Sequence, residues 1–217
     1  MTTDKQPMPK PQMPKPQMSG LGPGTILMTS EGEMPVEWLA PGDKVLTRDR
    51  GAQPVIWIKR MRANAPGAAP LPAPLVLFPG DCGRAATPWE KLRLCPGHRV
   101  LLRLPEVELN FAEKEVLASV SDLSRRGAPR LDPDMGPLVY HHIVMPRHEL
   151  ILAGGLWVES TDAAMAAQLD APNVVRRSSE LFQSGSKSVR MCLTSEEAQM
   201  IRKATPSDMS LMDLIAA

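Results

Sequence analysis

The sequence predicts an all-β fold built from short strands, and three observations lead to this prediction. Short apolar runs recur between turn dipeptides, and β-branched residues are frequent in them. Prolines are abundant, 23 in 217 residues, and a proline cannot occupy a helix interior without breaking it. Long stretches with helical periodicity are few. Together these features favour strands, turns and loops over a helical bundle.

Turns and strands alternate most densely in residues 20–60. Pro23-Gly24 precedes a short apolar run, and Pro41-Gly42-Asp43 turns the chain before another. The last strand of this region has apolar side chains on both faces, which is typical of a buried strand. The expected strands are 25–28, 44–47 and 53–60.

The remainder of the expected domain contains further short strands. Residues 92–104 keep an apolar period of two around Pro96-Gly97, which predicts a hairpin of two strands. Residues 111–123 fit either a strand followed by a turn or one short helical turn. The other expected elements are a strand at 75–78, a connector at 105–110, two strands that pair with each other at 137–145 and 148–153, and a strand at 156–160.

Both ends of the chain differ from this β-rich region. Residues 1–19 contain MPKPQ twice in tandem, and such a proline-rich stretch cannot bury enough apolar area to order itself, so we expect a disordered arm. Residues 161–217 are expected to form a partly helical tail. Thr194 and Glu197 match a capping box for a helix at 196–203, and a second helix is expected at 207–215. The predicted organisation is therefore an arm (1–19), a domain (20–160) and a tail (161–217).

Composition excludes several functional classes. The net charge of +1 gives the protein no overall electrostatic attraction to nucleic acid or to an anionic membrane. The three cysteines (Cys82, Cys95 and Cys192) are widely spaced and suggest neither a zinc site nor a disulfide framework. No signal peptide and no apolar run of membrane-spanning length is found, so we expect a cytoplasmic protein, although export by an unrecognised route stays open. No partner is identifiable, but the arm or the tail helices could bind another protein.

Histidines are the main candidates for acid–base chemistry. His98 follows the Pro96-Gly97 turn, and the other three lie within eight residues, at 141, 142 and 148. His141 and His142 would point to opposite faces of a strand, so they are poorly placed to bind one metal ion. We expect neither a metal nor a cofactor.

Several sequence blocks resemble the bacterial branch of the Hint (hedgehog/intein) domain family. The opening Pro-Gly-Thr turn of that family is similar to residues 23–25, and its Pro-Gly-Asp…Val-Leu-Thr-Arg-Asp segment is similar to residues 41–49. Its Ser/Thr-Pro-x-His-Arg-Val-Leu-Leu block is matched by residues 95–102, with cysteine in the first position. Its Tyr-x-His…Asp-Arg-His-Glu-Val-Ile block is matched by residues 140–151, with proline in place of the aspartate.

This resemblance implies a horseshoe-shaped domain whose first residue lies near the middle of the fold. In active members that residue, usually cysteine, attacks the preceding carbonyl carbon, and a histidine protonates the departing amide nitrogen. The resemblance assigns the histidine to His98, the neighbouring orienting position to Cys95 and the later histidine to His148. Two positions depart from the pattern: the nucleophile position is Gly20, and the acidic position is Pro146.

Two functions follow as hypotheses. One is a degenerate Hint domain that has lost self-cleavage and acts as a binding or structural module. The other is residual autoproteolysis of the arm, using Ser19 or Cys95 together with His98. A third use of the histidines, on an external substrate, has no supporting motif. Whether the protein is an enzyme is therefore left open by the sequence.

Overall fold

The computed structural model describes residues 18–62, 71–72, 74–77, 92–124, 137–183, 187–206 and 214–215. The expected disordered arm lies almost entirely outside these ranges, as do Cys82 and most of the helix expected at 207–215. The described elements, in chain order, are β1 (Ile26–Thr29), β2 (Gly32–Pro35), β3 (Lys44–Thr47), β4 (Gly51–Pro54), β5 (Trp57–Arg62), β6 (Leu75–Leu77), β7 (Leu92–Leu94), β8 (Arg99–Leu102), α1 (Pro105–Phe111), β9 (Val116–Ser119), α2 (Val120–Leu123), β10 (Val139–Val144), β11 (Leu150–Ala153), β12 (Leu156–Glu159), α3 (Ala163–Gln168), α4 (Asn173–Ser178), the 3₁₀ helix η3 (Glu180–Phe182), β13 (Met191–Cys192) and α5 (Ser195–Ala204).

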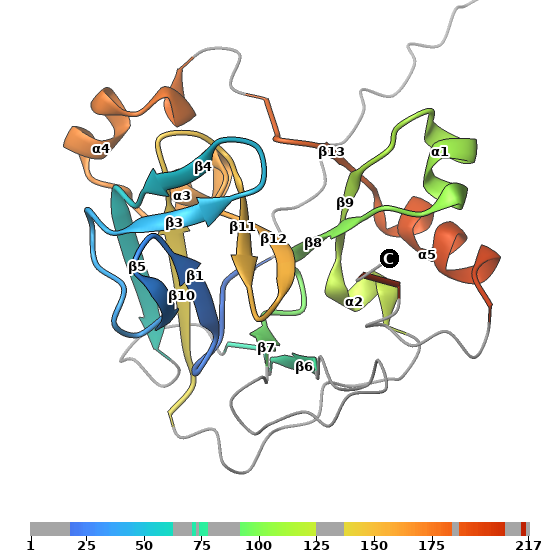
Figure 1. The fold of residues 1–217 in the computed structure, drawn as a ribbon, viewed down its shortest axis with the longest axis horizontal. Coiled ribbons are helices and arrows are strands. Elements are labelled where there is room, and N and C mark those ends of the chain that lie inside the picture. The colour runs from blue at the N-terminus through green and yellow to red at the C-terminus, as the bar shows by residue number, and fades with distance from the viewer. Residues whose placement is uncertain are drawn as a thin grey trace, which may run out of the picture.

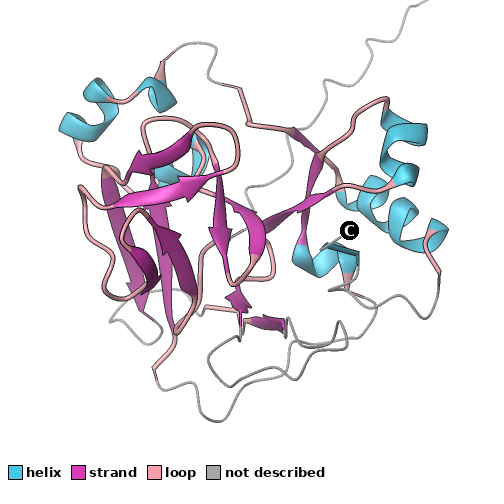
Figure 2. Ribbon diagram, in the orientation of Figure 1, coloured by secondary structure: helices cyan, strands magenta, loops and turns pink. Residues whose placement is uncertain are grey.

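Strands dominate the described part of the chain (Figure 2). Nine of the described strands form one sheet, in the order β13-β9-β8-β12-β11-β1-β3-β4, with β2 paired to β1. Two further pairs, β10 with β5 and β6 with β7, are antiparallel. The prediction of a β-rich fold is confirmed, but helices are more numerous in the domain than an all-β description allows.

One apolar core spans the large sheet and reaches the tail. It includes Leu27 of β1, Val100 of β8, Ile151 of β11 and Ile201 of α5, all fully buried. A second cluster packs β10 against α3 and α4, through Val144, Ala166 and Val175 among others. Figure 1 shows α1, α2 and α5 gathered around β9, at the opposite end of the fold from α4. Buried apolar contacts therefore connect residues 163–206 to the strands.

An ion-pair cluster also holds the tail on the sheet. Arg190 binds Asp49 with both terminal nitrogens, at 2.7 and 2.9 Å, and its Nε donates to Glu115 at 2.9 Å. Glu115 also pairs with Arg48. The cluster thus joins the turn after β3, the loop before β9 and the chain entering β13.

Three expected pairings or elements are corrected by the structure. Residues 92–104 do not form a hairpin: β7 pairs with β6, whereas β8 pairs with β9 and β12. Residues 137–145 and 148–153 do not pair with each other: β10 lies against β5, and β11 lies between β12 and β1. Residues 105–110, expected to be a connector, lie in the helix α1. Pro105 is compatible with this helix because it occupies the first turn, where a backbone N–H has no partner within the helix.

Other expectations hold with small shifts in boundary. β3 matches its expected range, and the strand expected at 53–60 is interrupted between β4 and β5. Residues 111–123 contain both alternatives, the strand β9 followed directly by the helical turn α2. In α5, the Thr194 hydroxyl accepts from the Glu197 amide and the Glu197 carboxylate accepts from the Thr194 amide, which is the predicted capping box. No helix among the described residues is long and apolar enough to cross a membrane.

Candidate active site

The start of the domain is held between two strands from distant parts of the sequence. Leu21 exchanges two backbone hydrogen bonds with His141 of β10, at 2.8 and 2.9 Å. On its other side, Gly22 donates to the Arg93 carbonyl at 2.7 Å, and Cys95 donates to the Gly20 carbonyl at 3.0 Å. Residues 20–22 therefore lie in the interior, bonded on both edges, and the peptide bonds just before them are fixed in position.

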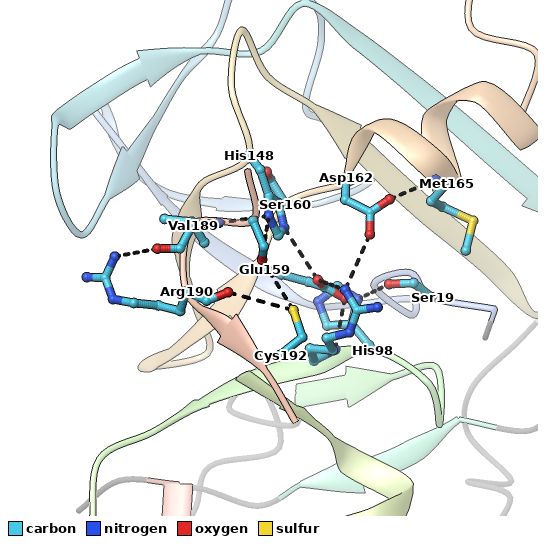
Figure 3. Close-up of polar contacts among 12 residues, drawn as sticks. Ser19, His98, His148, Glu159, Ser160, Asp162, Met165, Val189, Arg190 and Cys192 are labelled. Atoms are coloured by element: carbon cyan, nitrogen blue, oxygen red, sulfur yellow. Dashed lines mark hydrogen bonds and ion pairs between the residues drawn. The ribbon is translucent and has the colours of Figure 1, made fainter. Parts of the chain in front are cut away.

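His98 faces these peptide bonds. Its Nδ1 lies 2.7 Å from the Ser19 hydroxyl and 3.1 Å from the Gly20 amide nitrogen (Figure 3). An amide N–H can only donate, so Nδ1 is the acceptor and the proton of the neutral ring is on Nε2. The Ser19 hydroxyl then donates to the same nitrogen.

Burial determines the charge of His98. The ring is 3% exposed, and this desolvation lowers its pKa to about 4, although the charge of nearby Glu159 opposes the shift. The imidazole is thus neutral at pH 7 and is a weak base.

Cys95 contacts the peptide unit one residue earlier. It lies between β7 and the Pro96-Gly97 turn, is fully buried, and its thiol donates to the Met18 carbonyl oxygen at 3.0 Å. Burial raises the pKa of this thiol to about 11, so it is protonated at neutral pH. Protonated Cys95 can stabilise negative charge on the Met18 oxygen, but it is a poor nucleophile.

A side chain at Gly20 would be tightly packed and strained. A Cβ on this residue would lie 3.0 Å from Cβ of Tyr140 and 3.3 Å from Nε2 of His142, both on β10. The backbone φ of Gly20 is +132°, a value that residues with side chains rarely adopt. His142 itself is buried and its pKa is lowered by that burial to about 3, so a neutral ring occupies the volume.

His148 belongs to a neighbouring cluster. Its Nε2 lies 3.4 Å from Oε2 of Glu159 at the end of β12, and its Nδ1 accepts from the Val189 amide at 3.2 Å (Figure 3). Glu159 also accepts from the backbone amide and guanidinium of Arg99, at 3.1 and 2.9 Å. Burial lowers the pKa of His98 and the charge of Glu159 opposes that shift, so this carboxylate is close to both histidines.

Pro146 contributes a structural contact through its carbonyl oxygen. Its carbonyl oxygen accepts from the Leu181 amide at 2.7 Å and from the Ser179 hydroxyl at 3.0 Å. It thereby fixes the turn between α4 and η3 against the end of β10. Pro146, where the resemblance would place an acidic residue, is thus a point where residues 179–181 are attached.

Residues 20–164 match the family model for the Hint domain. The chain belongs to the Hint domain family. The match covers about two thirds of the sequence and begins at Gly20, next to Leu21, which bridges β7 and β10.

Two solved structures to which the chain is similar are inteins. The gp41-1 intein has 11% sequence identity and a TM-score of 0.36, and the match covers 65% of this chain and 98% of the intein. The MchDnaB-1 intein has 20% identity and a TM-score of 0.37, covering 64% and 98% respectively. No protein with a curated function matches the sequence.

The structure brings some of the sequence-predicted residues together and separates others. His98, Cys95 and Gly20 meet at one point, with Ser19 among them, whereas His148 lies beyond Glu159, and Pro146 contacts residues 179–181. Sequence reasoning missed Glu159. The available signal was a lone carboxylate ending an otherwise apolar strand, LWVE, where a buried charge requires partners.

Proposed function

We propose that this Hint domain has lost the acyl shift at the nucleophile position of the family and acts as a scaffold that presents its arm and tail to a partner. The observation that carries the proposal is Gly20, which has no side chain and whose Cβ space is bordered by Tyr140 and His142. His98 still contacts the Gly20 amide, the nitrogen that it would protonate if the Ser19–Gly20 bond were cleaved. His98 is therefore in place beside this bond, with Nδ1 as a hydrogen-bond acceptor, but residue 20 has no side chain that can attack the bond or supply a proton.

A separate observation favours a second candidate, self-cleavage one residue earlier. The Ser19 hydroxyl donates to His98, and the Met18 carbonyl accepts from Cys95. In this reaction Oγ of Ser19 bonds to the Met18 carbonyl carbon, the Met18–Ser19 amide bond breaks, and the hydroxyl proton passes through His98 to the released Ser19 amine. Water then hydrolyses the resulting ester. The protonated Cys95 thiol serves as the donor to the developing oxyanion, in a role distinct from attack.

The mass of the purified full-length protein decides between the two candidates. Under the first, the mass stays constant for days, with or without hydroxylamine. Under the second, hydroxylamine accelerates the loss of residues 1–18, Ser19→Ala abolishes that loss and Ser19→Cys accelerates it, because a thiol is the better nucleophile. The new N-terminus identifies the bond: Ser19 indicates the serine reaction, and Gly20 would indicate cleavage in the register of the family, which contradicts both candidates.

A further inference from the structure

A second serine–histidine contact lies on the tail side of the domain. Ser188 is exposed, and its hydroxyl lies 3.3 Å from Nδ1 of His148. The side chain of His148 is only 2% exposed. An exposed serine hydroxyl therefore contacts a buried imidazole.

The tautomer of His148 follows from a backbone contact. The Val189 amide can only donate, and it lies 3.2 Å from Nδ1. The lone pair is thus on Nδ1, and the proton of the neutral ring is on Nε2, facing Oε2 of Glu159 at 3.4 Å. The three groups follow the order hydroxyl, imidazole, carboxylate that general-base activation of a serine requires. The Nε2–Oε2 separation is an ion-pair distance, and Nε2 makes no hydrogen bond among the described residues.

Glu159 is held as an anion. Burial disfavours its charge, but the close contact with His148 and the positive charge of Arg99 outweigh burial and hold its pKa at about 2. The guanidinium of Arg99 is in turn placed by Asp162, at 3.3 Å. The carboxylate can therefore orient the His148 ring and stabilise an imidazolium.

We propose that Ser188, His148 and Glu159 form a second nucleophilic site, which accepts the acyl group of an unhindered, activated ester. Ser188 Oγ bonds to the acyl carbon, the ester C–O bond breaks, and the hydroxyl proton moves through His148 to the departing alcohol. Water, deprotonated by the same imidazole, releases the carboxylic acid and restores Ser188. This site is independent of the proposed function, because neither Gly20 nor Ser19 contributes to it.

The experiment uses the full-length protein with a fluorophosphonate probe and with p-nitrophenyl acetate. We expect one label, located on Ser188 by peptide mass spectrometry, and ester hydrolysis above the buffer rate. Ser188→Ala removes the label and lowers hydrolysis at least tenfold, and Glu159→Gln lowers both rates at least tenfold. Ser195→Ala is the matched control, since Ser195 is a tail serine bound to a carboxylate, Asp122, at 2.9 Å. This control should react like the unaltered protein.

Exposure of Ser188 means that Ser188→Ala should fold, so this variant decides the assignment even if Glu159→Gln does not fold. A label that persists in Ser188→Ala, that lies on Ser19 or on Cys192, or that never forms, overturns the proposal. Cys192 is the relevant neighbour, because its sulfur lies 3.2 Å from the Ser188 hydroxyl.

Discussion

Gly20 stands at the position that the resemblance assigns to the nucleophile, and its surroundings on β10 disfavour a side chain there. The residue combines a positive φ with close approach to Tyr140 and His142. Each feature alone disfavours a side chain, and the two act together at one backbone position. Under the proposed scaffold function, a single substitution at Gly20 should therefore not restore self-cleavage.

Gly20→Cys should lower the free energy of unfolding by about 1–3 kcal/mol, because the new Cβ must displace Tyr140 or His142 and because φ is unfavourable. Chemical denaturation measures this change, and intact mass should show no cleavage. Gly32→Ala is the matched control: its φ is +109° but nothing lies within 4 Å of its Cβ, so it reports backbone strain alone. A Gly20→Cys variant that is as stable as the parent chain and cleaves itself would contradict the scaffold proposal.

At the scale of single residues, the sequence located part of the candidate site. Gly20, Cys95 and His98 could be placed together because the motif blocks keep their order and because the site depends on local turns. Glu159 could not be placed at the site from sequence. It reaches the Arg99 amide only because β12 pairs with β8. The contacts of Ser188 with His148 likewise depend on the docking of the tail.

Among the elements, the pairing of strands was the least predictable feature. Period-two patterns identify strands and their faces, but they carry no information about which strand is the neighbour. The Pro96-Gly97 turn therefore suggested a hairpin, whereas β7 and β8 diverge into different pairs at that turn. By contrast, α5 was predicted from its own residues, because a capping box is a local interaction.

The capping box of α5 gives a prediction for this element. Thr194→Ala should destabilise the protein by about 1 kcal/mol, since the Glu197 amide loses its acceptor at the helix start. Thermal and chemical unfolding measure the change. Glu197→Gln is the control, because glutamine can keep the reciprocal bond to the Thr194 amide. A loss in Glu197→Gln with none in Thr194→Ala would indicate that charge, and not capping, stabilises this end of α5.

For the molecule as a whole, the buried histidines make stability dependent on pH. His98 and His142 have pKa values lowered by burial to about 4 and about 3, from the ordinary value of 6.5. Between pH 6.5 and 4 the unfolded chain therefore binds protons that the folded chain does not. The free energy of unfolding should fall as pH falls through this window, by roughly 1.4 kcal/mol per pH unit for each histidine.

Urea titrations at pH 7.5, 6, 5 and 4.5 test this expectation. His142→Gln should flatten the slope, because one of the two groups no longer titrates. Met200→Leu, at a partly exposed position on α5, should leave the slope unchanged. A stability that is constant from pH 7.5 to 4.5 would show that these rings are protonated as readily in the folded protein as in the unfolded chain.

The two ends of the nine-stranded sheet also have a consequence for self-association. An open sheet edge is a template on which another chain can add a strand. Here one edge is β13, only two residues long and paired parallel to β9, and the other is β4, which starts at Gly51 and ends at Pro54. Short strands and a residue without an amide proton offer a second molecule few groups to pair with. By pairing with β9, the short β13 of the tail leaves little open edge at this end of the nine-stranded sheet.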